Sequence, residues 1–304
     1  QRQMCIRDSL LREAIKMSLE NLNKMLKDAE DNNYAVPQFN VWNLEWISAV
    51  LDKCQELKTP VILGVSQNGA KYMGGFYVVT QMIKAYIKKN NITIPVAIHL
   101  DHASSFEACK EAIDEGFTSV MIDASRKPFE ENLDITKKVV EYAHPRNVTV
   151  EAELGKVGGK EEEVVAESFY ADKNECLKMV QEAKIDALAP ALGSQHGFYK
   201  GEPKLGLKEM KEIHDLVKLP LVLHGGSGIP DDQIKQAINY GTVKININTD
   251  CLCAWVKIVH EIIKENPQEI DPRKIIGPGK KGIQDVIENR CLVFGSIGKA
   301  NING

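Results

Sequence analysis

The sequence predicts an α/β fold, a single (β/α)8 TIM barrel with an N-terminal helix and extra C-terminal helices. Short runs rich in Val, Ile and Leu alternate with amphipathic stretches along the chain, and eight such pairs are present. The runs are apolar on both faces, as in parallel strands covered by helices, and 304 residues fit one such barrel. A doubly wound open sheet is the alternative, but no Gly-x-Gly-x-x-Gly motif follows the first predicted strand.

The predicted elements follow one another in a regular order. A helix over residues 18–30, with Ser18 as its cap, comes first. The predicted strands span residues 35–41, 60–65, 94–100, 119–122, 148–154, 187–192, 220–224 and 243–247. The helices between them span residues 43–57, 78–89, 106–115, 130–142, 174–182, 207–217 and 231–240. Two more helices, over residues 251–264 and 272–288, are expected to complete the outer ring.

Two segments stand apart from this pattern. Residues 155–170 are punctuated by glycine and rich in charge, which predicts a mobile active-site loop. Residues 1–16 do not lead into a strand, so we expect a disordered or extraneous extension before a catalytic domain over residues 17–304.

Composition excludes several classes of function. The formal net charge is −4 with no basic cluster, so binding to nucleic acid is not expected. The 7 cysteines are scattered and form no Cys-x-x-Cys pair, which is typical of a protein made in the reducing cytoplasm. No run of apolar residues is long enough for a membrane span or a signal-peptide core. We therefore expect a cytoplasmic protein that works without a membrane.

Three histidines come at the ends of predicted strands. His102, His196 and His224 each follow a short apolar run, whereas the histidines at 144, 214 and 260 fall in helices or at their ends. A single histidine is more often structural than a ligand, but the carboxyl ends of barrel strands are where such folds place their chemistry. Three neutral imidazoles leave the fourth position of a zinc ion open for substrate. The sequence thus predicts a catalytic Zn²⁺ site.

Carboxylates accompany these histidines. Asp101 directly precedes His102, and successive side chains of an extended strand point in opposite directions. If His102 turns to the metal after the strand ends, Asp101 can lie in the pocket as an acid/base; the alternative is a cap for the next helix. Asp123 and Glu153 also end strands, where they could orient a ligand histidine, bind a second cation or serve as ordinary polar residues.

Two loops predict a phosphate site. The peptide GGSG at residues 225–228 follows the seventh predicted strand, and NINT at residues 246–249 follows the eighth. In barrels these two loops often bind phosphate through backbone N–H groups and a helix N-terminus. Lys200 could add a positive charge to the same group. Glycine-rich turns alone are weak evidence, because any tight turn needs glycine.

These motifs together resemble the class II, metal-dependent fructose-1,6-bisphosphate aldolases and the similar tagatose-bisphosphate aldolases. The likeness runs from about residue 18 to the C-terminus, and HLDH combined with HGGSG is its most specific part. It also includes the peptides YAVPQFNVWNLE, PVILGVSQNGAKYMGGF, SVMIDAS, VEAELGKVGG, LAPALGSQHGFYKGEP, KININTD and DPRKIIGPG.

The resemblance implies a role for each matching residue. His102, His196 and His224 would bind Zn²⁺, Asp101 would be the acid/base, and Asp123 with Glu153 would match a second position for a divalent or monovalent cation. The matching substrate-binding positions are Ser66, Gly197, Lys200, Gly225, Gly226, Ser227, Asn246, Ile247, Asn248 and Thr249. Glu161 matches a loop glutamate that moves the proton at the nucleophilic carbon. A homodimer or homotetramer that reversibly cleaves fructose 1,6-bisphosphate into dihydroxyacetone phosphate and glyceraldehyde 3-phosphate is implied.

Departures from the family pattern leave the substrate open. Residues 250–255 read DCLCAW where the family often has an arginine, and Arg126 and Lys127 replace a common histidine pair. Tagatose 1,6-bisphosphate, or another dihydroxyacetone-phosphate-dependent reaction, is therefore the alternative. Two further alternatives remain. One is a metal-dependent barrel hydrolase, although a phosphate cradle has no role in hydrolysis of an unphosphorylated substrate. The other is a structural zinc protein or an assembly subunit without activity, although a structural zinc site usually has four protein ligands, often including cysteine.

Overall fold

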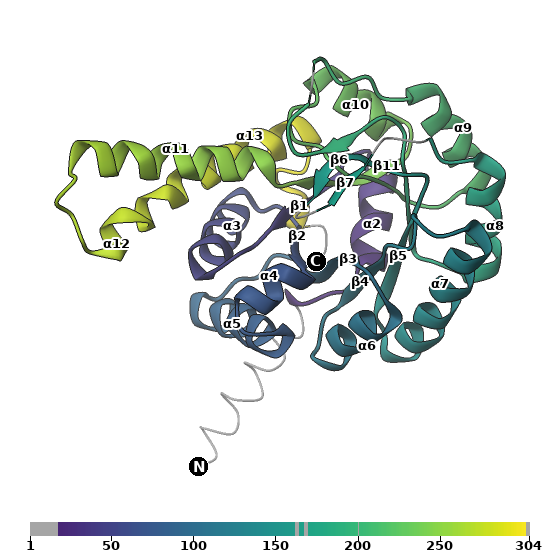
Figure 1. Cartoon of the computed structure of the whole chain (residues 1–304), viewed down its shortest axis with the longest axis horizontal. Coiled ribbons are helices and arrows are strands. Elements are labelled where there is room, and N and C mark those ends of the chain that lie inside the picture. Colours follow the sequence, from purple (N-terminus) through teal and green to yellow (C-terminus); the bar gives the residue numbers. More distant parts are fainter. Residues whose placement is uncertain (1–17, 162–163, 167–169, 200, 302–304) are drawn as a thin grey trace, which may run out of the picture.

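Eight parallel strands close into a barrel, in the order β1-β11-β10-β8-β5-β4-β3-β2 (Figure 1). The computed structural model describes residues 18–301 except 162, 163, 167–169 and 200. The barrel strands are β1 (Val36–Asn40), β2 (Val61–Ser66), β3 (Val96–Ala103), β4 (Ser119–Ile122), β5 (Thr149–Leu154), β8 (Ala187–Pro190), β10 (Leu221–Leu223) and β11 (Thr242–Ile247). Each overlaps a strand predicted from the sequence, so the (β/α)8 barrel is confirmed. The proposed extension over residues 1–16 lies outside the described residues.

Helix α2 (Leu22–Asp31) lies across the amino end of the barrel (Figure 1). Its apolar face buries Leu22, Met25 and Leu26 in one cluster with the first inward-facing layer of the strands, which includes Val36 and Ile62. The cap is Asn21, whose side chain accepts a hydrogen bond from the backbone of Asn23. The predicted N-terminal helix is therefore present, but it begins later than expected and Ser18 is not its cap.

The helices that follow the strands form the outer ring. They are α3 (Leu44–Leu57), α4 (Gln67–Tyr72), α5 (Phe76–Asn90), α6 (Phe106–Asp114), α7 (Phe129–Ala143), α8 (Lys173–Ala183), α9 (Leu207–Val217) and α10 (Asp231–Asn239). Every helix predicted between strands is present, and α4 is an addition. Short 3-10 turns occur at His144–Arg146, Gly277–Gly279 and Lys299–Asn301. No helix in the described ranges combines the length and the apolar character needed to cross a bilayer.

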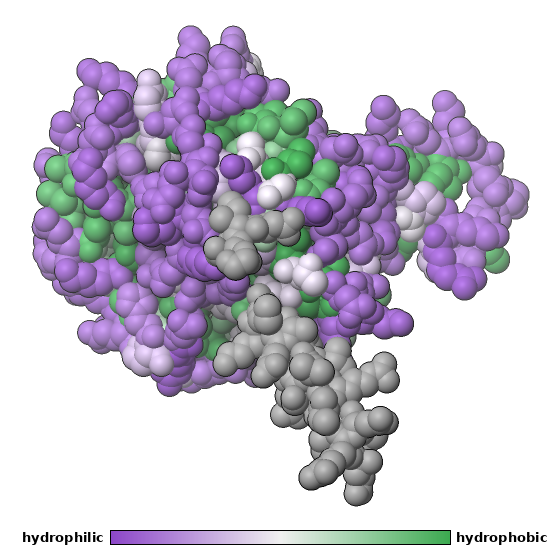
Figure 2. Space-filling view, turned by 180° about the vertical axis from the view of Figure 1, so that it is seen from behind, coloured by the Kyte–Doolittle hydropathy of each residue, from purple (hydrophilic) through white to green (hydrophobic). Residues whose placement is uncertain are grey.

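The C-terminal helices form an arm that extends away from the barrel (Figure 1). It consists of α11 (Thr249–Glu265), α12 (Pro272–Ile275) and α13 (Lys280–Phe294), and α13 returns to pack on α3. The single helix predicted over residues 272–288 is wrong, because the peptide Gly277-Pro278-Gly279 interrupts it and α13 continues to Phe294. From the opposite side, Figure 2 shows apolar surface on the arm, where Val256, Ile263 and Ile270 are exposed.

A small second sheet lies over the carboxyl end of the barrel. Strands β6 (Gly158–Glu161) and β7 (Val164–Ala166) pair in antiparallel fashion, and β6 pairs in parallel with β9 (Gln195–His196). The segment predicted as a loop over residues 155–170 thus contains two strands, which its glycines and charges concealed. Its mobility stays a prediction.

The inside of the barrel changes from apolar to polar along its axis. Above the layer that packs on α2, the inward-facing side chains include the completely buried polar residues Gln38, His99, Glu151 and Lys244. Barrel interiors are usually filled by branched aliphatic side chains. The polar layer lies directly below the strand ends that carry the predicted site.

Candidate active site

A cavity of about 390 Å³ opens at the carboxyl ends of the strands. It is lined by Asn40, Trp42, Ser66, Asp101, His102, His196, Gly197, Phe198, Gly225, Ser227, Asn246, Asn248, Thr249 and Leu252. Ten of these fourteen residues are ones that the sequence predicted as catalytic, metal-binding or substrate-binding. The structure therefore brings most of the predicted site together around one cavity.

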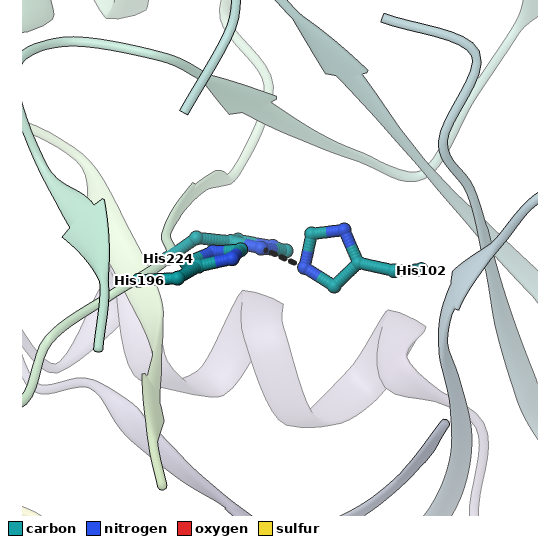
Figure 3. Close-up of side chains that lie close together, drawn as sticks. All are labelled: His102, His196 and His224. Carbon is teal, nitrogen blue, oxygen red and sulfur yellow. Dashed lines mark hydrogen bonds between the residues drawn. The ribbon is translucent and has the colours of Figure 1, made fainter. Parts of the chain in front are cut away.

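The three predicted ligand histidines converge (Figure 3). One ring nitrogen from each of His102, His196 and His224 lies within 4.8 Å of the others. The Nδ1 of His224 is 2.7 Å from the Nε2 of His102, and the ring centroids of His102 and His196 are 5.0 Å apart. Figure 3 shows His196 and His224 approaching from one side and His102 from the other. This arrangement offers three imidazoles to a single cation.

A left-handed backbone conformation aims His102 at the site. We expected strand β3 to end before Asp101, but it continues to Ala103. His102 has φ +50°, which is rare for a residue with a Cβ, and the pairing of β3 with β4 shifts register there. This bulge breaks the alternation of side chains, so Asp101 and His102 both line the cavity. Backbone strain of this kind concentrates at functional sites.

The imidazoles of His102 and His224 hydrogen bond to carboxylates through their outer nitrogens. His102 Nδ1 lies 3.0 Å from Asp123 Oδ2, and His224 Nε2 lies 2.8 Å from Glu151 Oε1. Each contact leaves the other ring nitrogen directed toward the cluster, as is usual for metal-binding histidines. Burial, reinforced by the charge of His102, lowers the pKa of His224. A neutral imidazole is the form that can coordinate a metal.

A second group of candidate ligands adjoins the first. His102, Asp123 and Glu153 each offer an atom within 4.8 Å of the others. Burial alone would raise the pKa of Asp123, but hydrogen bonds from His102 and Ser125 outweigh it and hold the pKa below its usual value. The carboxyl group is therefore ionised, as a cation ligand must be. The geometry is compatible with the predicted second cation position.

Asp101 is held at the wall of the cavity by two amides. Its carboxylate accepts hydrogen bonds from Asn40 Nδ2 at 2.9 Å and from Asn246 Nδ2 at 3.3 Å. The residue is 2% exposed; burial raises the pKa of the carboxyl group, but the neighbouring His102, His224 and Lys244 outweigh burial and lower it. Helix α6 is capped by Ser105, so the alternative of Asp101 as that cap is wrong. The ionised carboxylate can accept a proton from a bound ligand.

The two predicted phosphate loops lie side by side. The backbone N–H of Gly226 donates to the carbonyl of Asn246 at 3.0 Å, and Ser227 Oγ accepts from the backbone N–H of Asp250 in the first turn of α11 at 3.2 Å. Gly225 has φ +64°, and a Cβ there would lie 2.2 Å from the carbonyl oxygen of Gln195. Glycine is thus required, because a neighbouring backbone occupies the space.

A family profile for class-II fructose-bisphosphate aldolases matches residues 20–299. The chain belongs to the class-II fructose-bisphosphate aldolase family. It is 58% identical over 285 residues to the fructose-bisphosphate aldolase of Geobacillus stearothermophilus, covering 93% of this chain and 99% of the relative. The fructose-bisphosphate aldolase of Staphylococcus epidermidis strain RP62A is 56% identical, with coverage of 93% and 100%. The crystal structure of the YdjI aldolase from Escherichia coli K12 superposes with a TM-score of 0.81 at 35% identity, covering 93% of this chain and 100% of that one.

Membership of the class-II aldolase family confirms the resemblance seen in the sequence and the expected enzyme class, a carbon–carbon lyase. The family is generally metal-dependent and acts on phosphorylated sugars. The residues present in this chain fit a metal ion. Three imidazoles converge, and carboxylates orient two of them through their outer nitrogens.

Some predicted residues of this class-II aldolase lie elsewhere. Ile247 is completely buried in the apolar core, and neither it nor Gly226 lines the cavity. The backbone of Glu161 lies in β6, but its side chain is outside what the structure describes, and so is Lys200.

Several residues of the candidate site were not predicted from the sequence. Asn40 at the end of β1 and Glu151 two positions before Glu153 could have been found from the alternation along their strands. Lys244 could have been noticed because it is a charged residue in the middle of a predicted strand. Tyr199, whose hydroxyl joins two loops of the site, has no such local signal.

Proposed function

We propose that this chain is a zinc-dependent fructose-1,6-bisphosphate aldolase, which reversibly forms dihydroxyacetone phosphate and glyceraldehyde 3-phosphate. The observation that carries the proposal is the convergence of three imidazoles beside the Asp101 carboxylate, in a cavity whose wall includes both predicted phosphate loops. The names of the two bacterial relatives, at 58% and 56% identity, support fructose 1,6-bisphosphate as the substrate.

In this proposal the histidine cluster holds the catalytic ion. His102, His196 and His224 are the zinc ligands, and zinc supplies Lewis acidity that polarises the ketose carbonyl. Asp123 and Glu153, together with His102, form the position for a second divalent or monovalent cation.

The residues of the two loops bind the phosphate of the dihydroxyacetone half. Gly225, Ser227, Asn248 and Thr249 line the cavity next to the N-terminus of α11, where backbone N–H groups and the helix dipole favour an anion. Ser66, Gly197, Gly226, Asn246, Ile247 and Lys200 are the remaining proposed substrate-binding positions. A phosphate fixed here holds the sugar carbonyl at the histidine cluster.

Asp101 and Glu161 are the proposed proton carriers. In cleavage, Asp101 takes the proton from the hydroxyl group on the aldehyde side of the breaking carbon–carbon bond. The carbon–oxygen bond of that hydroxyl group becomes the aldehyde carbonyl. The electron pair of that bond stays on the dihydroxyacetone carbon, and Glu161 delivers the proton to it. In synthesis both protons move in reverse. Asn40 and Asn246 keep the Asp101 carboxylate directed into the cavity.

The experiment is a coupled assay of triose phosphate release by the purified full chain. Activity on fructose 1,6-bisphosphate should disappear after chelation and return with Zn²⁺, and the ratio of kcat/KM against tagatose 1,6-bisphosphate decides between the two ketoses. Ester or amide hydrolysis without triose phosphate release would instead support the hydrolase alternative. Asp101→Ala is the matched control. The variant should keep its zinc and its melting temperature but lose turnover. Loss of folding in this variant would instead favour the structural alternative.

We also propose that the chain works in the cytoplasm as a homodimer or homotetramer. The C-terminal arm carries apolar surface and exposes Val256, Ile263 and Ile270, and apolar surface gathered in one region is typical of protein–protein contacts, which supports self-association. Light scattering on the purified protein should give the mass of two or four chains. A chain that begins at Met17 should keep full activity if residues 17–304 are the catalytic domain.

A further inference from the structure

A completely buried ion pair lies in the polar layer below the site. The Nζ of Lys244 on β11 is 2.7 Å from Oε2 of Glu151 on β5, and both side chains are 0% exposed. The contact is an ion pair rather than a well-directed hydrogen bond. The free energy needed to remove two charges from water can exceed the free energy gained from their attraction. A buried ion pair is therefore weak evidence that the contact stabilises the fold. The pair therefore calls for a reason other than folding.

The other oxygen of Glu151 supplies that reason. Its Oε1 lies 2.8 Å from Nε2 of His224, whose side chain is 1% exposed. A carboxylate accepts hydrogen bonds, so Nε2 of His224 carries the proton and Nδ1 keeps its lone pair. That Nδ1 faces His102 Nε2 at 2.7 Å and Glu153 Oε2 at 3.8 Å. Glu151 thus determines which nitrogen of His224 is presented to the candidate metal site.

The surroundings of Glu151 leave it little freedom to do anything else. Lys244 balances its charge from one side, and His99 Nε2 lies 3.8 Å from its Oε2. His99 is in turn hydrogen bonded to Ser119 through Nδ1, at 2.8 Å. The carboxylate is therefore held between Lys244 on β11, His99 on β3 and His224 directly after β10. In contrast, the carboxylate partner of His102, Asp123, has a side chain that is 20% exposed at the mouth of the barrel.

We propose that Glu151 and Lys244 are positioning residues that together orient His224, fix its tautomer and so raise the affinity of the histidine cluster for its metal ion. Lys244 allows a full carboxylate, rather than a weaker neutral acceptor, to be buried behind the imidazole. The inference deepens the proposed function, since it concerns the same site, but it is measured by metal binding and not by turnover. It holds or fails whichever ketose bisphosphate is the substrate.

Two double variants test the proposal without leaving an unpaired buried charge. Glu151→Gln with Lys244→Met keeps a neutral acceptor for His224, and Glu151→Leu with Lys244→Met removes the acceptor. Each purified full chain is stripped of metal and titrated with Zn²⁺ against a chromophoric chelator, and then with Co²⁺ to record its visible absorption. We expect zinc affinity to fall by about 10- to 100-fold, more for the leucine variant, with a changed cobalt spectrum in both.

The control is Lys53→Met, which removes another buried lysine, paired with Glu56 and Glu288 on the outer helices. It should bind zinc with wild-type affinity. Wild-type zinc affinity and an unchanged cobalt spectrum in the double variants would overturn the proposal, even if their stability changed. Should a double variant not fold, ¹⁵N NMR of the metal-free wild-type protein decides. We expect the proton of His224 on Nε2, and the opposite tautomer would overturn the proposal.

Discussion

Replacing Tyr199 by phenylalanine tests whether one hydroxyl joins the candidate metal ligands to the predicted phosphate loop. The hydroxyl donates to the carbonyl of Gly225 at 2.8 Å and accepts from the backbone N–H of Gln195 at 3.0 Å. Gln195 precedes the candidate ligand His196, and Gly225 belongs to the predicted phosphate loop. Burial raises the pKa of Tyr199 to about 12, so the hydroxyl remains a donor throughout the physiological range.

Tyr199→Phe leaves two backbone groups without this partner. An unsatisfied buried polar group costs about 1–3 kcal/mol of folding free energy. The Tyr199 ring is only half-buried, so each of the two groups should cost an amount at the low end of that range, about 2 kcal/mol together. For a chain of 304 residues this corresponds to a fall of about 3–5 °C in melting temperature. Since the loops also lose their common anchor, kcat/KM should fall by about tenfold, which corresponds to about 1.4 kcal/mol.

The assays are thermal unfolding of the metal-loaded protein and steady-state cleavage of fructose 1,6-bisphosphate at saturating zinc. The matched control is Tyr86→Phe, which also removes a hydrogen-bonded hydroxyl, one that donates to Asp52 at 2.7 Å on the outer helices. It should lower the melting temperature without changing kcat/KM. If Tyr199→Phe behaves in the same way, the bridge is merely structural and the reasoning is refuted.

The remaining predictions concern the proton carrier, the cradle and the barrel interior. Asp101→Asn should lower kcat by about 100-fold or more with zinc content unchanged. The substitution removes the negative charge and places an amide donor opposite the donors of Asn40 and Asn246. Retained turnover would exclude Asp101 as the acid/base. Gly225→Ala should raise KM for the phosphorylated substrate, since its Cβ would meet the carbonyl of Gln195, and unchanged binding in calorimetry would contradict this. Burial and Lys244 lower the pKa of His99 from 6.5 to about 3. Only the unfolded chain therefore protonates this imidazole as the pH falls below 6.5, and this should destabilise the metal-free fold by about 1.4 kcal/mol at pH 5.5. Urea unfolding of His99→Gln should lack this slope.

Much of the fold was predictable because the strands of a parallel barrel are short, doubly apolar and followed by amphipathic helices. The convergence of the three candidate ligand histidines was predictable for a related reason: each lies beyond an apolar run, and parallel strands end on the same side. The interrupted helix near Pro278 was a misjudgement of local chemistry, because Gly-Pro-Gly is a strong breaker.

Other features were not accessible from the sequence pattern. The bulge at His102 depends on a positive φ that no local motif requires of histidine. The strand pattern marks Glu151 and Lys244 as unusual residues, but it does not show that they pair across the barrel, and that pairing is what allows both charges to be buried. The strand β9 has only two residues and exists through its pairing with β6.

That pairing couples two parts of the candidate site that lie far apart along the chain. Gly158 and Gly159 are in register with Gln195 and His196, so the hairpin that carries Glu161 is hydrogen bonded to the backbone that carries a candidate metal ligand. An engineer who shortens or grafts this hairpin to accept a new sugar will therefore also disturb the coordination of the ion. Substrate scope and metal retention have to be optimised jointly in this scaffold.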